Sequence, residues 1–203
     1  MTVIDNPLKA APTVLVTAVG GAEGARGAAA ALACAAADPD VAPLLIEVGG
    51  RAPRPTLIAS AAAQRLEGRL KAQMPEAKVA ARGQVCHLAV LAEPEGLEIA
   101  AGAATTAREA GVVVHLPSAL LQDVLALPAV RASAVLLRAD LGRDRALVAL
   151  AVRDLIEQGV AAAVLKRRLA WIAERRALFG VLPPGSPGGL PERLVRQLTS
   201  KRS

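Results

Sequence analysis

Short runs of aliphatic residues alternate with longer alanine- and leucine-rich segments along most of this chain. Brief, continuous aliphatic runs are typical of strands buried on both faces of a parallel sheet, and the longer segments are typical of the helices that cover it. The alternation therefore predicts an α/β fold, a three-layer sandwich with a mostly parallel sheet of about six strands. The predicted strands are Thr13–Val19, Leu44–Val48, Val85–Leu91, Val112–Leu116, Ala134–Arg138 and Ala161–Leu165. The predicted helices are Ala25–Ala37, Pro55–Ala72, Glu95–Ala110, Ala119–Ala126 and Asp144–Gln158.

Two helix ends carry the residue types that favour them. Thr56 precedes an apolar run and predicts a helix start, and Gly159 follows Gln158 and predicts a helix stop. No segment of the chain repeats another, so we expect one domain and not an array.

The pattern changes after Leu165. Arg167–Phe179 is helix-prone, but its basic and apolar residues interleave instead of segregating. The Pro/Gly-rich linker VLPPGSPGG follows, and Pro191–Thr199 predicts a short helix with leucines on one stripe. We therefore expect an N-terminal extension at residues 1–11, an α/β domain at residues 12–180, and a linker with a basic tail at residues 181–203.

Composition limits the class of protein. With 203 residues, of which 53% are hydrophobic, the chain can bury the core of one domain. Its N-terminus lacks a basic segment followed by an apolar run, and the longest small or apolar stretch, Gly27–Ala37, is too short to span a bilayer. Cys34 and Cys86 form no CxxC pair, so we expect buried free thiols in a reducing compartment. These features predict a cytoplasmic protein.

The net charge of +6 is concentrated near the carboxyl end. Residues 166–203 carry nine basic and two acidic side chains, which gives this segment +7 and the rest of the chain −1. A basic tail can contact an acidic protein, anionic lipid or nucleic acid through its charge. Trp171 and Phe179 are the only aromatic residues, so the chain has no stacking platform for single-stranded nucleic acid. A tail that folds back on its own domain is the alternative.

The stretch VLVTAVGGAEGARGAAAALA is the most informative in the chain. A predicted strand runs into a glycine-rich turn and then into a helix. This geometry directs backbone N–H groups and a helix N-terminus at one point, which suits an anion such as phosphate. A tight strand-to-helix turn also needs glycines for steric reasons, so a purely structural role is the alternative. The glycines concerned are Gly20, Gly21, Gly24 and Gly27.

The order of such segments in residues 12–168 resembles the ParA/MinD-type P-loop NTPases. The glycine-rich turn lies where the phosphate loop of that family lies. Four further segments are similar to the family's second strand with its switch-like segment, its Walker B strand, the next strand with its helix, and the last strand. They are LLIEVGGRAPRPTL, VVVHLPS, AVLLRADLGRDRALVAL and AAAVLKRRL. The resemblance implies a P-loop NTPase-like fold that binds ATP or ADP.

The positions that the family uses for chemistry differ here. Hydrolysis needs a lysine on the phosphates, a hydroxyl on Mg²⁺ and a Walker B carboxylate. Ala25 and Arg26 follow Gly24, and His115 occupies the Walker B position. Glu47 replaces the aspartate of the second strand, and Lys166 replaces the asparagine that contacts adenine. We therefore predict an inactive relative with no catalytic residue.

Several of these side chains have two readings. Arg26 can pair with a phosphate or face solvent at a helix start. Glu47 can contact a ligand or serve as a polar group at a strand end. We interpret His115 as a strand-end residue and His87 as structural, and two histidines without clustered partners make no metal site. The predicted cofactor-binding residues are Gly20, Gly21, Gly24, Arg26, Gly27 and Glu47.

The resemblance implies a scaffold that works as a homodimer and positions other components of the cell, together with an unidentified protein partner. The alternative is a Rossmann-type domain that senses NAD, because Glu47 follows Gly27 by about the 20 residues at which an acidic side chain contacts the ribose. The glycine spacing from Gly21 is G-x-x-G-x-x-G and not G-x-G-x-x-G. A chain without tyrosine also lacks the catalytic residue of the short-chain dehydrogenases.

Overall fold

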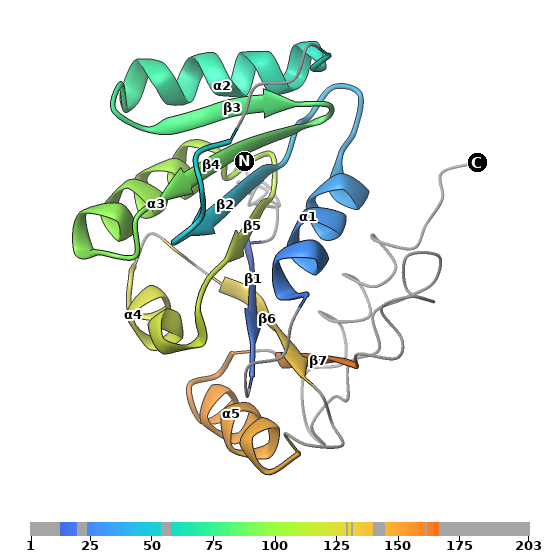
Figure 1. The fold of residues 1–203 in the computed structure, drawn as a ribbon, viewed down its shortest axis with the longest axis vertical. Helices are drawn as coiled ribbons and strands as arrows, with labels where there is room; N and C mark the ends of the chain where they lie inside the picture. The colour runs from blue at the N-terminus through green and yellow to red at the C-terminus, as the bar shows by residue number, and fades with distance from the viewer. Residues whose placement is uncertain are drawn as a thin grey trace, which may run out of the picture.

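A seven-stranded sheet runs through the centre of the protein (Figure 1). The computed structural model describes residues 13–19, 24–53, 58–128, 130, 132–139, 145–160 and 162–166. The strands lie in the order β3-β4-β2-β5-β1-β6-β7, and every neighbouring pair is parallel except β3 with β4. They are β1 (Thr13–Ala18), β2 (Leu44–Val48), β3 (Lys78–Arg82), β4 (Val85–Val90), β5 (Val112–His115), β6 (Ala132–Ala139) and β7 (Ala162–Lys166).

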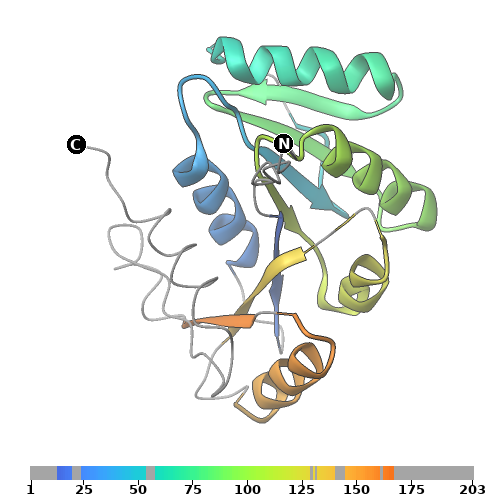
Figure 2. The same cartoon turned by 180° about the vertical axis from the view of Figure 1, so that it is seen from behind.

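Helices cover both faces of this sheet, as Figures 1 and 2 show from opposite sides. Helix α1 lies alone among the described helices on one face, where Ala29 and Leu32 pack against Val16, Leu45 and Val113. The other helices bury their apolar residues in the larger core on the opposite face. The helices are α1 (Ala25–Ala36), α2 (Ala61–Gln73), α3 (Pro94–Thr106), the 3-10 turn Ser118–Leu120, α4 (Leu121–Leu125) and α5 (Arg145–Glu157).

The predicted α/β class, the layered arrangement and the mostly parallel sheet are confirmed. The six predicted strands correspond to β1, β2 and β4–β7, with ends that differ by two residues at most. Their parallel neighbours and their cover on both faces explain why continuous aliphatic runs identified them. Gly159, at φ 71°, ends α5 as predicted.

Strand β3 was not predicted. Its sequence, KVAAR, has three small apolar residues between two charges, which is too short and too weakly hydrophobic to stand out. Arg82 pairs with Val85, so Gly83 and Gln84 form a two-residue hairpin turn in which Gly83 has a φ of 59°. This glycine-containing turn before the VCHLAV strand is the signal that could have revealed the hairpin.

The predicted start of the second helix is wrong. Ile58 and Ala59 are not helical, Ala59 forms a bridge with Gly83, and α2 begins at Ala61 after the N-cap Ser60. The Ser60 hydroxyl accepts a hydrogen bond from the N–H of Ala63 at 3.1 Å, which satisfies a donor that the helix leaves free. Thr56 itself lies outside the described residues.

Three further predictions meet different outcomes. Helix α3 ends at Thr106, four residues before the predicted end, because residues 107–110 form turns. Cys86 is buried, and burial raises the pKa of its thiol to about 12, but Cys34 is exposed on α1, contrary to the prediction. The N-terminal extension, the linker with its tail, and the helices predicted at Arg167–Phe179 and Pro191–Thr199 lie outside the described residues.

The strand order determines where the ends of the elements meet. Strand β5 lies between β2 and β1, and α1, which joins β1 to β2, crosses over it. The N-terminus of α1 and the carboxyl ends of β1, β5 and β2 therefore lie at one edge of the sheet, which is where open α/β folds bind ligands. Among the described residues, no helix is long and apolar enough to cross a bilayer.

The N-cap of α2 gives a test of the revised helix start. Replacing Ser60→Ala removes the hydroxyl that accepts from Ala63, and we expect a loss of about 1 kcal/mol in the free energy of unfolding. Thr56→Ala, at the start that the sequence alone predicted, is the matched control and should cost clearly less. Urea denaturation measures both, and an equal loss in the two variants would contradict the revised start.

Candidate functional site

The described part of the glycine-rich turn begins at Gly24, the N-cap of α1. Gly24 has a φ of 90°, in the left-handed region that a residue with a side chain rarely adopts. It makes no side-chain cap, and the N–H of Ala28 is the first to bond inside the helix, to the oxygen of Gly24 at 2.9 Å. The N–H groups of the first turn therefore have no partner within α1. Gly20 and Gly21 lie outside the described residues.

Arg138, at the carboxyl end of β6, lies beside this turn. The side chain is buried, and its Nε and one terminal nitrogen would be 3.6 and 3.9 Å from a Cβ placed on Gly24. The positive end of α1 and a buried guanidinium thus face the same connection, an arrangement that favours an anionic group of the chain or of a ligand. The sequence analysis did not single out Arg138.

Arg26, in the first turn of α1, binds Glu47 of β2. The Nε of Arg26 is 2.7 Å from Oε1 of Glu47, and a terminal nitrogen is 2.9 Å from Oε2. This two-bond geometry is the strongest that an arginine and a carboxylate form. The two side chains differ in their surroundings, because that of Arg26 is 59% exposed and that of Glu47 only 3%. The charge of Arg26 is therefore paired with that of a buried carboxylate.

Glu47 lies beneath the turn that follows β2. A Cβ placed on Gly50 would be 2.6 Å from the Cβ of Glu47 and 2.8 Å from its Oε2, distances that real atoms do not occupy. Gly49 turns the chain with a φ of 72°. A pair of glycines after a strand such as LLIEV usually indicates a simple turn, but here Gly50 leaves room for the carboxylate. No sequence pattern indicated this role.

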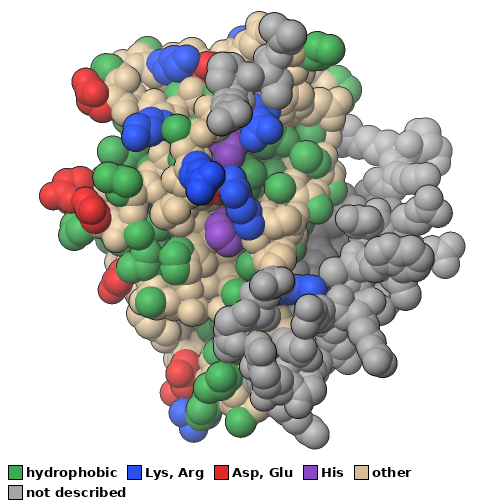
Figure 3. Space-filling model, viewed as in Figure 1, with side chains coloured by type: hydrophobic (Ala, Val, Ile, Leu, Met, Phe, Trp, Pro, Cys, Tyr) green, Lys and Arg blue, Asp and Glu red, His purple; other side chains and the backbone are tan. Residues whose placement is uncertain are grey.

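Two neighbouring strands bring the chain's only histidines to the same carboxylate. His115 of β5 pairs in register with Glu47, and His87 of β4 lies diagonally from it on the same face. The Nε2 of His87 is 3.2 Å from Oε2 of Glu47, although not in hydrogen-bond geometry. Both histidines lie on the face seen in Figure 3, where Lys and Arg side chains gather around them.

The electrostatics of this cluster follow from burial. Burial alone would raise the pKa of Glu47, but the hydrogen bonds and charge of Arg26, with the histidines, lower it below its usual value. Burial lowers the pKa of His87 and of His115, against the attraction of Glu47. At neutral pH the cluster therefore contains one carboxylate, the charge of Arg26 and two neutral imidazoles. Arg82 of β3 adds a further positive charge near His87.

The structure brings three of the predicted site residues together. Gly24, Arg26 and Glu47 lie at the carboxyl ends of the parallel strands, joined by the Arg26–Glu47 pair. Gly27 is exposed in α1, and a Cβ placed on it would meet no atom of the described residues within 4 Å, so no contact among these residues requires a glycine there. His87, interpreted as structural, is part of the site because it lies against Glu47.

Two side chains of the described cluster differ from those that magnesium-dependent hydrolysis of ATP uses. Arg26, the cation at the start of α1, is bound to Glu47, and His115 cannot support Mg²⁺ as a carboxylate does. In the described part of the chain, no group of three or more His, Cys, Asp or Glu side chains could hold a metal ion. Proton transfer and ion pairing are the chemistry that this cluster can perform.

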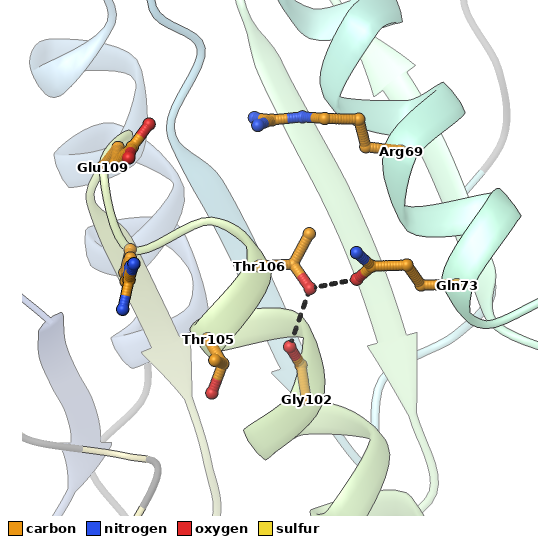
Figure 4. A pocket seen from close by; sticks show the side chains of 7 residues that line it. Arg69, Gln73, Gly102, Thr105, Thr106 and Glu109 are labelled. Carbon is orange, nitrogen blue, oxygen red and sulfur yellow. Dashed lines mark hydrogen bonds between the residues drawn. The ribbon is translucent and has the colours of Figure 1, made fainter.

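A recess lies between α2 and the C-terminal end of α3, away from the glycine-rich turn (Figure 4). Its volume is about 580 Å³, and Arg69 and Gln73 of α2 point into it opposite Thr106. The hydroxyl of Thr106 already bonds Gln73 and the oxygen of Gly102. The recess is lined by polar and mostly exposed residues, and no buried charge or unpartnered group among them marks it as a site.

The Arg26–Glu47 pair can be measured with a double-mutant cycle. Arg26→Met leaves a buried carboxylate without its partner, and we expect a loss of about 1–3 kcal/mol, below the range for fully buried pairs because solvent reaches Arg26. Glu47→Gln should cost less, since an amide oxygen still accepts from Arg26. The double variant should then lose clearly less than the two single losses added together; additive losses in urea denaturation would mean that the pair does not couple.

Two glycines provide a matched comparison near the site. Gly50→Ala should destabilise the protein by about 1–3 kcal/mol, because the new methyl group displaces the side chain of Glu47. Gly27→Ala, in open space on α1, should be neutral or stabilise by about 0.5–1 kcal/mol. Thermal and urea unfolding of the two variants measure the difference. Equal effects would contradict the close packing of Gly50 on Glu47.

Comparison with known proteins assigns no family to this geometry. No protein-family model matches the chain, and a search of curated proteins found no match. The function of the site is therefore argued from its own residues.

Proposed function

We propose that this protein is a catalytically inactive, ParA/MinD-like protein that acts as an interaction or positioning scaffold. The observation that carries the proposal is the bidentate pair between Arg26 and Glu47. Arg26 stands in the stretch where the resemblance places a lysine for phosphate and a hydroxyl for Mg²⁺, and Glu47 stands where it places an aspartate. Because the two side chains neutralise each other, neither is free for the chemistry of hydrolysis.

The strand order supports this proposal over a Rossmann-type sensor of NAD. In the classic Rossmann order the first two strands are neighbours. Here β5 separates β1 from β2. The acidic residue that would contact the ribose is Glu47, which is buried and bound to Arg26. Binding of NAD in the Rossmann manner would need β1 and β2 to be neighbours and Glu47 to be released from Arg26.

Nucleotide binding without turnover is compatible with the proposal. An ATP or ADP phosphate would meet the N–H groups at the start of α1 and the side of Arg138, and not the charge of Arg26. Such binding would be weak, because the cation at the start of α1 is already paired with Glu47. We further propose a cytoplasmic location, a homodimer, and an unidentified protein partner. In this proposal the basic tail contacts that partner, anionic lipid or nucleic acid through its charge.

Turnover gives the direct test of the inactive assignment. With ATP or GTP and Mg²⁺, we expect no phosphate release above a no-protein control, because the loop lysine, the metal-binding hydroxyl and the Walker B carboxylate are missing. Robust hydrolysis that disappears in Arg26→Met, with that variant still folded by circular dichroism, would overturn the proposal.

Ligand-dependent stability distinguishes retained binding from a purely structural glycine turn. A ligand at 100 times its dissociation constant should stabilise the fold by about 2.7 kcal/mol. ATP, NAD and pyrophosphate are the probes, each up to about millimolar concentration. An increase in melting temperature with ATP or pyrophosphate alone supports an anion site, an increase that needs the nicotinamide moiety supports the Rossmann alternative, and no increase supports the structural role.

A further inference from the structure

Both histidines of this chain lie beside one buried carboxylate. They are the side chains that normally titrate near neutral pH. The sequence contains only His87 and His115, 28 positions apart, and the sheet brings both beside Glu47. The unperturbed pKa of histidine is about 6.5, so no other side chain with an ordinary pKa changes charge between about pH 5 and 8. A proton that either histidine takes up in this range therefore changes the charge beside the Arg26–Glu47 ion pair.

From this geometry we infer that the cluster of Arg26, Glu47, His87 and His115 is a proton-dependent latch, in which mild acid moves Glu47 from Arg26 to the histidines and releases the first turn of α1. This inference goes beyond the proposed scaffold function and does not require it. It concerns how firmly the start of α1 is held against the sheet.

The distances allow the exchange of partners. The Oε2 of Glu47 accepts from Arg26 at 2.9 Å and lies 3.2 Å from Nε2 of His87. The Nε2 of His87 makes no hydrogen bond in the present geometry, and a protonated ring carries a donor on both of its nitrogens. A small rotation then lets the imidazolium bind the carboxylate that Arg26 now holds. His115, opposite Glu47 in register, adds a second positive charge from β5.

Exposure decides which side chain leaves. Glu47, His87 and its strand neighbours are buried in the sheet, whereas the side chain of Arg26 is 59% exposed. When the histidines become charged, the cluster holds more positive than negative charge, since Arg82 also faces His87. Like charges at these separations repel each other. Arg26 can relieve the repulsion by moving into water, and its two hydrogen bonds to Glu47, which join α1 to β2, are then lost.

The direction of the pH effect follows from the charge of Arg26. Burial lowers the pKa of both histidines in the closed and in the released form, but the charge of Arg26 lowers it further only in the closed form, so the closed latch binds fewer protons than the released one. The stabilisation is therefore complete above the ordinary histidine pKa of about 6.5 and is lost as the pH falls below it. Protonation of Glu47 would act later, below its ordinary value of 4.5, because its pKa is lowered as well. The histidine variants described below separate a histidine-driven release from simple loss of the carboxylate.

The test uses the full chain and three NMR readouts between about pH 7.5 and pH 5. The readouts are the ring signals of the two histidines, the side-chain Nε–H signal of Arg26, and hydrogen exchange of α1 relative to α3. We expect the Arg26 signal to weaken with the midpoint of the histidine titration. Corrected for intrinsic exchange rates, protection of the α1 amides should fall about tenfold relative to α3 for each unit by which the histidine pKa differs between the closed and released forms.

Variants identify the groups responsible. His87→Gln with His115→Gln should abolish the pH response above about pH 5 while leaving the Arg26 signal in place. His115→Gln alone should leave a partial response, which keeps the test decisive if the double variant does not fold. Glu67→Gln is the matched control, because it removes another paired carboxylate, bound to Lys71 on α2, and should leave the response unchanged. An Arg26 signal that persists to pH 5, or a response unchanged in His115→Gln and in the double variant, would overturn the latch.

Discussion

The buried carboxylate of Glu47, near the carboxyl end of the interior strand β2, is the constraint on which the rest of this site depends. Glu47 is 2% exposed, and an unpaired charge at such a position would cost several kcal/mol. The surrounding residues can be understood as the means of keeping this charge stable. Arg26 supplies two hydrogen bonds, Gly50 supplies the space, and the histidines supply polar rings that remain neutral at neutral pH.

The same constraint links the two ends of the β1–β2 connection. Arg26 stands at the start of α1, and Glu47 stands near the end of the next strand, so their ion pair fastens the helix to the strand that it leads into. The charge of Arg26 at the start of this helix is therefore bound by a side chain of the protein itself. The geometry is that of a fold stabilised by an ion pair where the carboxyl ends of its parallel strands meet.

The class of fold and most of its elements could be predicted from the sequence because parallel strands covered on both faces leave long aliphatic runs. Strand β3 could not, since KVAAR at the sheet edge carries three small apolar side chains and two charges. The start of α2 was misplaced because Thr56 and Ser60 are both capping residue types, and only the bridge between Ala59 and Gly83 excludes the earlier one. Local patterns cannot register such tertiary contacts.

Only part of the site could be predicted, because local patterns do not show which residues meet in the folded chain. Gly24, Arg26 and Glu47 were identified because they follow strands at the expected spacing, but nothing in the sequence places Arg26 on Glu47 instead of on a ligand. His87 was read as structural because it stands inside an aliphatic strand, and its approach to Glu47 depends on β4 lying next to β2. Arg138 and Gly50 were missed because their roles consist of close contacts. Arg138 lies beside Gly24, which is distant in sequence, and Gly50 lies against the side chain of Glu47 beneath the turn.

The charges at the ends of β3 limit how this protein can assemble. Lys78 and Arg82 are exposed at the two ends of an edge strand whose interior residues are all small. Natural sheets use lysine and arginine in this way to prevent another strand from adding to a free edge, because a second copy would bring like charges together. A homodimer of this chain would therefore avoid sheet extension through β3.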